Sequence, residues 1–100
     1  MKLVARRNKS DSSVIKYRFE GAFTIYAVKK LKNVLMQELK SNKNVEIDMS
    51  GVQRIDTSGI QVLLHMKREA VKFDRKFIIK GIEGEVQKMT ALYDIELSSN

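Results

Sequence analysis

The sequence predicts one α/β domain over residues 1–100, with the element order β-β-α-β-α-β-α. In several short segments, apolar and charged residues alternate with a period of two, which is typical of half-buried strands. Between those segments, apolar residues recur every three or four positions, as in amphipathic helices. Because strands and helices alternate and crossovers between parallel strands are short and right-handed, we expect a mixed, mostly parallel sheet.

The first two predicted elements are strands. Residues 2–8 are expected to form the first strand, and the polar segment NKSDSS follows it as a turn. The next segment, VIKYRFEG (residues 14–21), alternates apolar with charged side chains over most of its length. It therefore predicts a strand that buries Ile15, Tyr17 and Phe19, and Gly21 is expected to end it.

A helix is predicted next, with Thr24 as its N-cap, because a threonine hydroxyl can accept a free backbone N–H of the first turn. The expected buried stripe consists of Val28, Leu31, Leu35 and Leu39, and the expected solvent-facing residues are Lys29, Asn33, Gln37 and Lys40. The segment SNKN ends this helix. Residues 44–49 then predict a short strand, because Val45, Ile47 and Met49 alternate with acidic residues.

The helical period returns from Ser58 onward. Its expected buried stripe is Gly59, Leu63, Met66, Ala70 and Phe73, with Ile60 and Leu64 to one side and with Gln61, His65, Arg68 and Lys72 facing solvent. FDRK is a connection, and KFIIKG predicts a buried strand. The segment GIEGEVQKMTALYDI predicts a final short helix that carries Val86, Met89, Leu92 and Tyr93.

Composition narrows the function classes. The chain has no cysteine, which excludes disulfides and thiolate metal sites. No segment reaches the roughly twenty apolar residues of a membrane helix, and no export signal opens the chain, so we expect a cytoplasmic protein without membrane insertion. The net charge is +7, but the cations are spread along the chain, which favours a solvated surface over nucleic-acid binding.

The segment from Asp48 to Gly59 is the candidate site. With a strand ending near Met49 and a helix beginning near Ser58, the residues between them should form a loop at the carboxyl edge of the sheet, where open α/β sheets carry functional groups. One interpretation is that Asp56 or Thr57 merely caps the helix. The other is that the free N–H groups of the first turn accept a phosphate or carboxylate.

Catalytic interpretations are disfavoured. DTSG resembles the Asp-Thr-Gly of aspartic proteases, but Ser58 interrupts that motif and a helical pattern follows it. Ser58 and His65 would lie about 10 Å apart along a helix, which exceeds the roughly 3 Å reach of a nucleophile and its base. Asp48 and Asp56 alone are too few ligands to predict a metal site. We therefore expect no enzyme activity, no cofactor and no metal.

The segment DMSGVQRIDTSGIQVLL resembles the signature of STAS domains, the family of bacterial anti-sigma factor antagonists. The shared pattern is Asp-apolar-Ser, a short spacer, and then Asp-Ser/Thr-x-Gly before an apolar helix. The resemblance covers roughly residues 14–95, with Gly-Ala-Phe-Thr in place of the family's usual Gly-Glu-Leu-Asp and with GIEGEVQKMTALYDI at the close. It implies a STAS-like fold whose helices pack mainly on one face of the sheet.

The resemblance also implies a non-catalytic switch. In the antagonists, the hydroxyl residue directly after the second aspartate is phosphorylated by a serine/threonine kinase that is also the anti-sigma factor. That position is Thr57 here, with Ser58 as the alternative. The implied partner-binding residues are Asp48, Ser50, Asp56, Thr57, Ser58, Gly59, Ile60, Gln61 and Leu64. Unmodified protein would bind the kinase and modified protein would release it, as a monomer or weak dimer.

Other STAS proteins are similar to this chain as well. The segment IDTSGIQVLLHMKREA also resembles small STAS proteins of chemotaxis operons and the small STAS subunit of lipid-transport ABC systems. In the second group the domain holds an ATPase subunit, and the threonine contributes to that contact without established phosphorylation. An ABC ATPase subunit is therefore the alternative partner.

Overall fold

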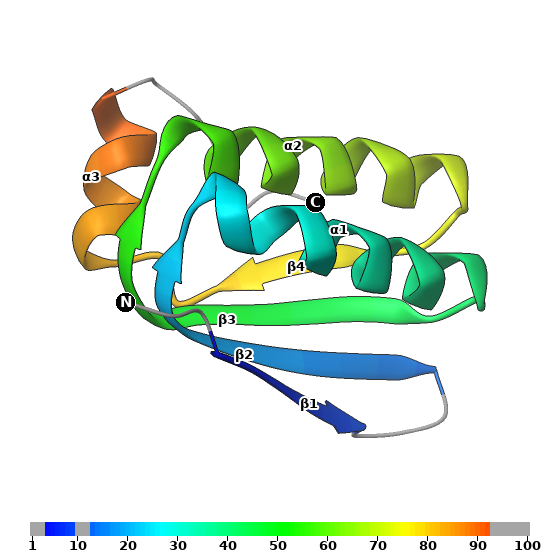
Figure 1. Ribbon diagram of the computed structural model, residues 1–100. Coiled ribbons are helices and arrows are strands. Elements are labelled where there is room, and N and C mark those ends of the chain that lie inside the picture. Colours follow the sequence, from blue (N-terminus) through cyan, green and yellow to red (C-terminus); the bar gives the residue numbers. More distant parts are fainter. Residues whose placement is uncertain (1–3, 10–12, 93–100) are drawn as a thin grey trace.

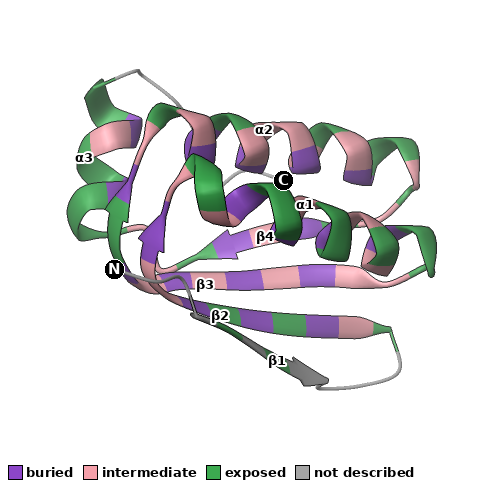
Figure 2. Cartoon of the chain, viewed as in Figure 1, coloured by how far each residue is buried: buried purple, intermediate pink, exposed green. Residues whose placement is uncertain are grey.

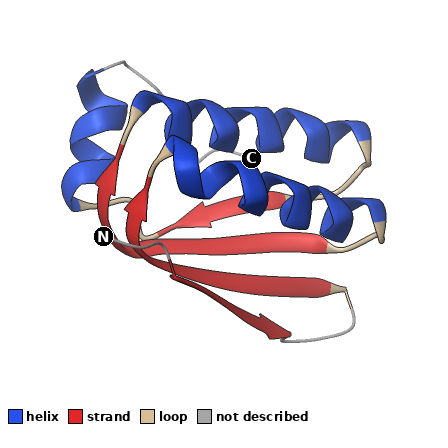
Figure 3. Ribbon diagram, in the orientation of Figure 1, coloured by secondary structure: helices blue, strands red, loops and turns tan. Residues whose placement is uncertain are grey.

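In a computed structural model, residues 4–9 and 13–92 are described, and they form a four-stranded sheet with three helices (Figures 1 and 3). The elements follow the predicted order β-β-α-β-α-β-α. Helices α1 and α2 lie side by side on one face of the sheet, and α3 lies at the end of β3 (Figure 1). The bounds are β1 Val4–Lys9, β2 Val14–Phe23, α1 Ile25–Lys40, β3 Asn44–Ile55, α2 Thr57–Lys72, β4 Phe77–Lys80 and α3 Gly84–Leu92.

The sheet is mixed and mostly parallel, as the alternating pattern predicted. Its strand order is β1-β2-β3-β4; β1 pairs with β2 antiparallel, whereas β3 is parallel to both of its neighbours. Each parallel step uses one helix as its crossover, which places both long helices on the same face. The carboxyl ends of β2 and β3 therefore lie beside each other, directly below the starts of α1 and α2 (Figure 1).

The core lies between the sheet and the two long helices. Along β2 and β3, buried and more exposed residues alternate over most of the strand length (Figure 2), as the period-two pattern predicted. The predicted stripe of the first helix is buried throughout, with Leu35 and Leu39 fully inaccessible. The predicted stripe of the second helix is also buried, except that Phe73 is only partly covered at the helix end.

The third strand is twice as long as predicted. It was expected to end near Met49, but β3 runs through 12 residues from Asn44 to Ile55, and the expected loop does not exist. The register against β2 shifts twice along this stretch, because Arg18 pairs with Asp48 and Glu20 with Gly51, and later Gly21 pairs with Val52 and Ala22 with Arg54. Such bulges interrupt the alternation and bend the strand. The ends of β2 and β3 curl toward the helices (Figure 1).

The second strand also continues beyond its predicted end. Gly21 does not end β2; it adopts a positive φ of 100° at the second register shift, and the strand runs on to Phe23. Glycine tolerates this backbone conformation without a steric penalty. Thr24 is the N-cap of α1 as predicted, but its side chain makes no capping hydrogen bond.

The last helix differs from its predicted face in one respect. Val86 is fully buried and Met89 partly buried, whereas Leu92 is 74% exposed. Tyr93, which was expected on this helix, lies outside the described residues. Among the described residues, no helix combines the length and the apolar character needed to cross a membrane.

Candidate functional site

Asp56 connects the first turns of the two long helices. It is the N-cap of α2, and its Oδ1 accepts the backbone N–H of Gly59 at 2.9 Å. Its Oδ2 accepts the backbone N–H of Ile25, the first residue of α1, at 3.3 Å. The capping interpretation of Asp56 is therefore correct, and the same carboxylate takes the place of the missing Thr24 cap at α1. Two helix N-termini, each with a partial positive charge, share one negative group.

Thr57 and Ser58 follow this carboxylate in the first turn of α2. The side chain of Thr57 is exposed, whereas Ser58 is half-buried beside α1. Because Thr57 is the first helical residue, it lies where backbone N–H groups lack intrahelical partners. A group attached to its hydroxyl would extend into solvent beside Asp56.

Gly59 and Ile60 pack the first turn of α2 against the sheet and the core. A Cβ built on Gly59 would lie 2.6 Å from the carbonyl oxygen of Phe23 and 2.7 Å from its ring, so only glycine lets α2 sit this close to the end of β2. Ile60 was expected on the contact surface, but its side chain is 1% exposed. That expectation is wrong, because Ile60 belongs to the core. Gln61 is exposed and Leu64 is partly buried.

Asp48 and Ser50 lie in β3 rather than in a loop, among charged side chains of the sheet. Asp48 accepts the backbone N–H of Ser50 at 2.9 Å and the Nη1 of Arg18 at 2.9 Å, and Arg18 also donates to Ser50 Oγ at 2.7 Å. The backbone N–H of Ser50 is the main reason why the pKa of Asp48 lies below its usual value. A Cβ on Gly81 would collide with this carboxylate.

The two aspartates therefore do not form one site. From the sequence, Asp48 and Asp56 were expected at the two ends of a loop. In the structure, residues 49–55 of β3 lie between them. Asp56 and Ser58 come together with the start of α1, whereas Asp48 and Ser50 come together with Arg18 across the β2–β3 pair. The structure assigns the Asp-apolar-Ser part of the motif to a polar cluster in the sheet.

Sequence reasoning missed two residues at this site. Ile25 and Tyr26 open α1 next to Asp56, and their side chains are 46% and 94% exposed. Exposed large apolar side chains that cluster at one place often mark an interaction surface. One signal was present in the sequence, since both residues precede the buried stripe of α1 and do not belong to it. With Thr57, Ser58 and Gln61 they form what we call the helix-start surface.

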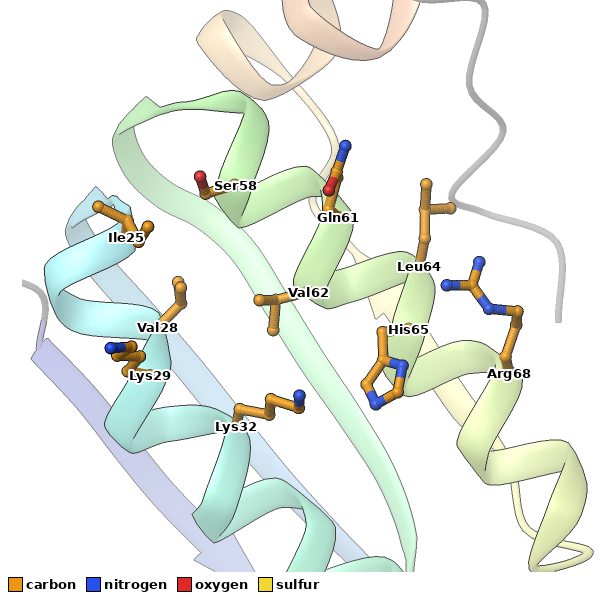
Figure 4. Close-up of a pocket in the computed structure, with 10 residues that line it drawn as sticks. All are labelled: Ile25, Val28, Lys29, Lys32, Ser58, Gln61, Val62, Leu64, His65 and Arg68. Atoms are coloured by element: carbon orange, nitrogen blue, oxygen red, sulfur yellow. The ribbon is translucent and has the colours of Figure 1, made fainter.

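A groove runs from this surface between α1 and α2, with a volume of about 620 Å³ (Figure 4). Val62 and His65 point from α2 toward α1, and Lys32 points from α1 toward α2 (Figure 4). His65 was expected to face solvent freely, but it is partly buried here. The lining residues are Ile25, Val28, Lys29, Lys32, Ser58, Gln61, Val62, Leu64, His65 and Arg68.

Within the described parts of the chain, no three His, Asp or Glu side chains gather in a way that could hold a metal ion. His65 lies farther along α2, with Val62 between it and Ser58 in the groove (Figure 4). The geometry thus offers an exposed hydroxyl, a capping carboxylate and apolar neighbours, which suits recognition by another macromolecule.

Comparison with protein families identifies the family of this chain. The family described as "Mlab, STAS domain" matches residues 5–97, nearly the whole chain. A search of curated protein sequences finds none that matches this chain.

Solved structures give matches of the same fold. The anti-sigma factor antagonist SpoIIAA of Bacillus has solved structures in its unphosphorylated and phosphorylated forms. Each is 13% identical to this chain with a TM-score of 0.75. The matches cover 89% and 90% of this chain and 83% of the SpoIIAA chain in both cases. An antisigma-factor antagonist STAS domain from Rhodobacter sphaeroides is 19% identical with a TM-score of 0.69, covering 84% and 94% of the two chains. The murine Solute Carrier 26 family member A9 anion transporter is 16% identical with a TM-score of 0.68, covering 84% of this chain and 14% of its own.

Proposed function

The chain belongs to the STAS domain family, and from this premise we propose that it is a non-catalytic regulatory protein of the anti-sigma factor antagonist type. In this proposal it binds a switch-type serine/threonine kinase through the helix-start surface, and phosphorylation of Thr57 by that kinase releases it. The observation that carries the proposal is the exposed Thr57 hydroxyl, which directly follows Asp56 at the first turn of α2.

The surroundings of Thr57 suit a binding surface that a phosphate can disrupt. Ile25 supplies exposed apolar area beside Ser58, Tyr26 adds exposed area at the start of α1, and Gln61 supplies a polar group one turn along α2. A partner that covers this area would remove Thr57 from water. A phosphothreonine carries about −1.5 to −2 charges at pH 7, and burying such a group without waiting cations is costly.

Asp56 strengthens this effect. Its carboxylate is fixed by two backbone N–H groups and therefore cannot easily turn away from a phosphate on the next residue. The helix N-terminus offers the phosphate a stabilisation of up to about 2 kcal/mol in the free protein. In the complex, the phosphate on Thr57 would be repelled by Asp56 and would lose its contact with water. In the free protein, the helix N-terminus would stabilise it. All three effects favour release.

Phosphorylation in vitro tests the proposal. The purified chain is incubated with a cognate switch kinase and ATP and is then analysed by mass spectrometry. We expect one phosphoryl group per chain, located at Thr57. Thr57→Ala should abolish it, and Ser58→Ala, a change at the neighbouring hydroxyl, should leave it in place. Modification at Ser58, or no modification with an active kinase, would contradict the regulatory part of the proposal.

A second candidate function is a constitutive adaptor, which holds a transport ATPase or a chemotaxis component without a phosphorylation cycle. The match to the family described as "Mlab, STAS domain" and the structural match to a transporter both favour it. The net charge of +7 also suits an acidic partner surface. In this case the partner would co-purify equally with the native chain and with Thr57→Glu, whereas the switch proposal requires that Thr57→Glu weakens binding.

A further inference from the structure

We propose that the groove between α1 and α2 binds an acidic amphipathic helix of a partner protein. The groove is open along its length, and its described lining includes the cations Lys29, Lys32 and Arg68 together with His65, but no acidic residue. A docking surface of this charge selects a partner segment of negative charge. Thr57 does not line the groove, so the proposal does not rest on phosphorylation.

The apolar residues of the groove favour a helix as the occupant. Val62 lies half-buried between the two helices, and Ile25, which is 46% exposed, lies at the end near Ser58 (Figure 4). Val28 also lines the groove but is only 1% exposed. A purely polar anion would gain no binding free energy from these apolar residues. An amphipathic helix places apolar side chains at positions i, i+3 or i+4 and i+7 into such a groove, and its remaining face carries charges to the rims.

The dimensions agree with a short helix. Along α2 the lining extends from Ser58 to Arg68, which is about 15 Å at the helical rise of 1.5 Å per residue. That length accommodates roughly three turns of a partner helix. A small molecule of ordinary size is usually enclosed over most of its surface, which an open groove does not provide.

Two of the described acidic residues lie near the groove but do not cancel its charge. Asp56 lies at the end beside Ile25, where its carboxylate accepts two backbone N–H groups. The pKa of Glu69 is lowered mainly by its hydrogen bond with Lys72 and further by the charges of His65 and Lys32. Its carboxylate pairs with Lys72 at 2.9 Å. The charge of Glu69 is therefore balanced by Lys72, and the described lining of the groove keeps its excess of cations.

A synthetic probe tests the proposal. The probe is a fluorescein-labelled peptide of about 14 residues with leucines at i, i+3 and i+7 and glutamates on the other face. Fluorescence anisotropy with the full chain should give saturable binding in the micromolar range that weakens with salt. A scrambled peptide of the same composition and a version with lysine in place of glutamate should each bind at least about tenfold more weakly.

Matched variants locate the binding. Lys32→Glu should weaken binding by about fivefold or more, whereas Lys30→Glu, the same single charge reversal on another side of α1, should change it by less than about twofold. Circular dichroism checks that each variant is folded. In ¹⁵N spectra, the amides of Val28 and Val62 should shift on peptide addition, and that of Lys16 on β2 should not.

Three results would overturn the proposal. The first is the absence of saturable binding by the peptide. This includes the case in which the chain binds phosphatidylglycerol vesicles, used as a second anionic probe, and does not bind the peptide. The second is an equal effect of Lys30→Glu and Lys32→Glu. The third is a set of amide shifts that falls on the sheet and spares α1 and α2.

Discussion

The Asp56 carboxylate accepts the backbone N–H of Ile25 at 3.3 Å, across 31 positions of the chain. This bond joins the first residue of α1 to the N-cap of α2. The proposed phosphorylation site at Thr57 therefore lies at a junction of two helices, and its position depends on both. A charge added at Thr57 acts on a carboxylate that holds the start of α1 as well as that of α2.

Removing this shared cap should destabilise the domain. We expect Asp56→Ala to lower the free energy of unfolding by about 1–2 kcal/mol or somewhat more, because two N–H groups lose their acceptor. Asp56→Asn keeps one side-chain oxygen and should have a smaller effect. Urea denaturation followed by circular dichroism measures both. Equal stability of all three proteins would show that water replaces the carboxylate at no cost.

Gly59 should not tolerate a side chain. In Gly59→Ala the new Cβ would meet the carbonyl oxygen of Phe23, and α2 would have to move away from β2. Overpacking of this kind costs about 1–3 kcal/mol, and it opposes the roughly 1 kcal/mol that alanine gains over glycine in a helix. We expect a net loss of stability in thermal melts. Gln61→Ala, on the exposed side of the same turn, is the control and should change stability by less than about 0.5 kcal/mol.

Tyr26 should matter for binding and not for folding. Because its side chain is 94% exposed, Tyr26→Ala should alter the free energy of unfolding by less than about 0.5 kcal/mol. If the helix-start surface binds the partner, the same change should weaken that binding by about fivefold or more, since exposed tyrosines are frequent hot spots.

The matched control for Tyr26 is Val71→Ala. Val71 is 72% exposed near the other end of α2, so its removal should leave partner affinity unchanged. Surface plasmon resonance with the captured partner measures both variants. Equal losses would mean that the partner does not bind at the helix starts.

Stability at acid pH should depend on Glu38. Arg7 Nε donates to its Oε2 at 2.7 Å and Tyr17 Oη donates to the same atom at 2.8 Å, and the hydrogen bond with Arg7 is the main cause of its lowered pKa. Because the folded protein depresses this pKa, the stabilisation is present above the ordinary value of 4.5 and is lost as pH falls through the lower folded pKa. Glu38→Gln should flatten the loss of stability below pH 4.5 in urea titrations. An unchanged acid profile would contradict this assignment.

The same contact predicts an alkaline effect with the opposite sign. Burial, and then the hydrogen bond with Glu38, raise the pKa of Tyr17 from 10.0 to about 12. A raised folded pKa means that stability is complete below about pH 10 and declines as pH rises toward 12. Tyr17→Phe should remove this decline, and absorbance of tyrosinate follows the titration directly. Titration of all tyrosines near pH 10 in the folded protein would exclude it.

The element order and the helix faces were predictable because they depend on local spacing. Leu31, Leu35 and Leu39 recur at helical intervals, and any sheet that covers that face buries them. The end of β3 was not predictable in the same way. Its second half contains Ser50 and Gly51 and breaks the alternation at two bulges, so its strand character comes from pairing with β2.

The site shows the same division between local and long-range information. The capping role of Asp56 could be read from its place before a helical pattern, and its bond to Gly59 is local. The bond to Ile25 could not be read, because it requires the ends of β2 and β3 to lie side by side. Ile60 was misplaced for a related reason, since the width of a buried stripe depends on what packs against it.

By itself, the sequence determined the order of the elements, the buried faces of both long helices and the position of Thr57 at a helix start, because each follows from neighbouring residues. The tertiary structure decided that Asp48 lies in the sheet away from that helix start, that one carboxylate serves two helices, and that Tyr26 stands exposed at the start of α1. These relationships join residues that are distant in the chain. They arise only when parallel pairing brings strand ends together.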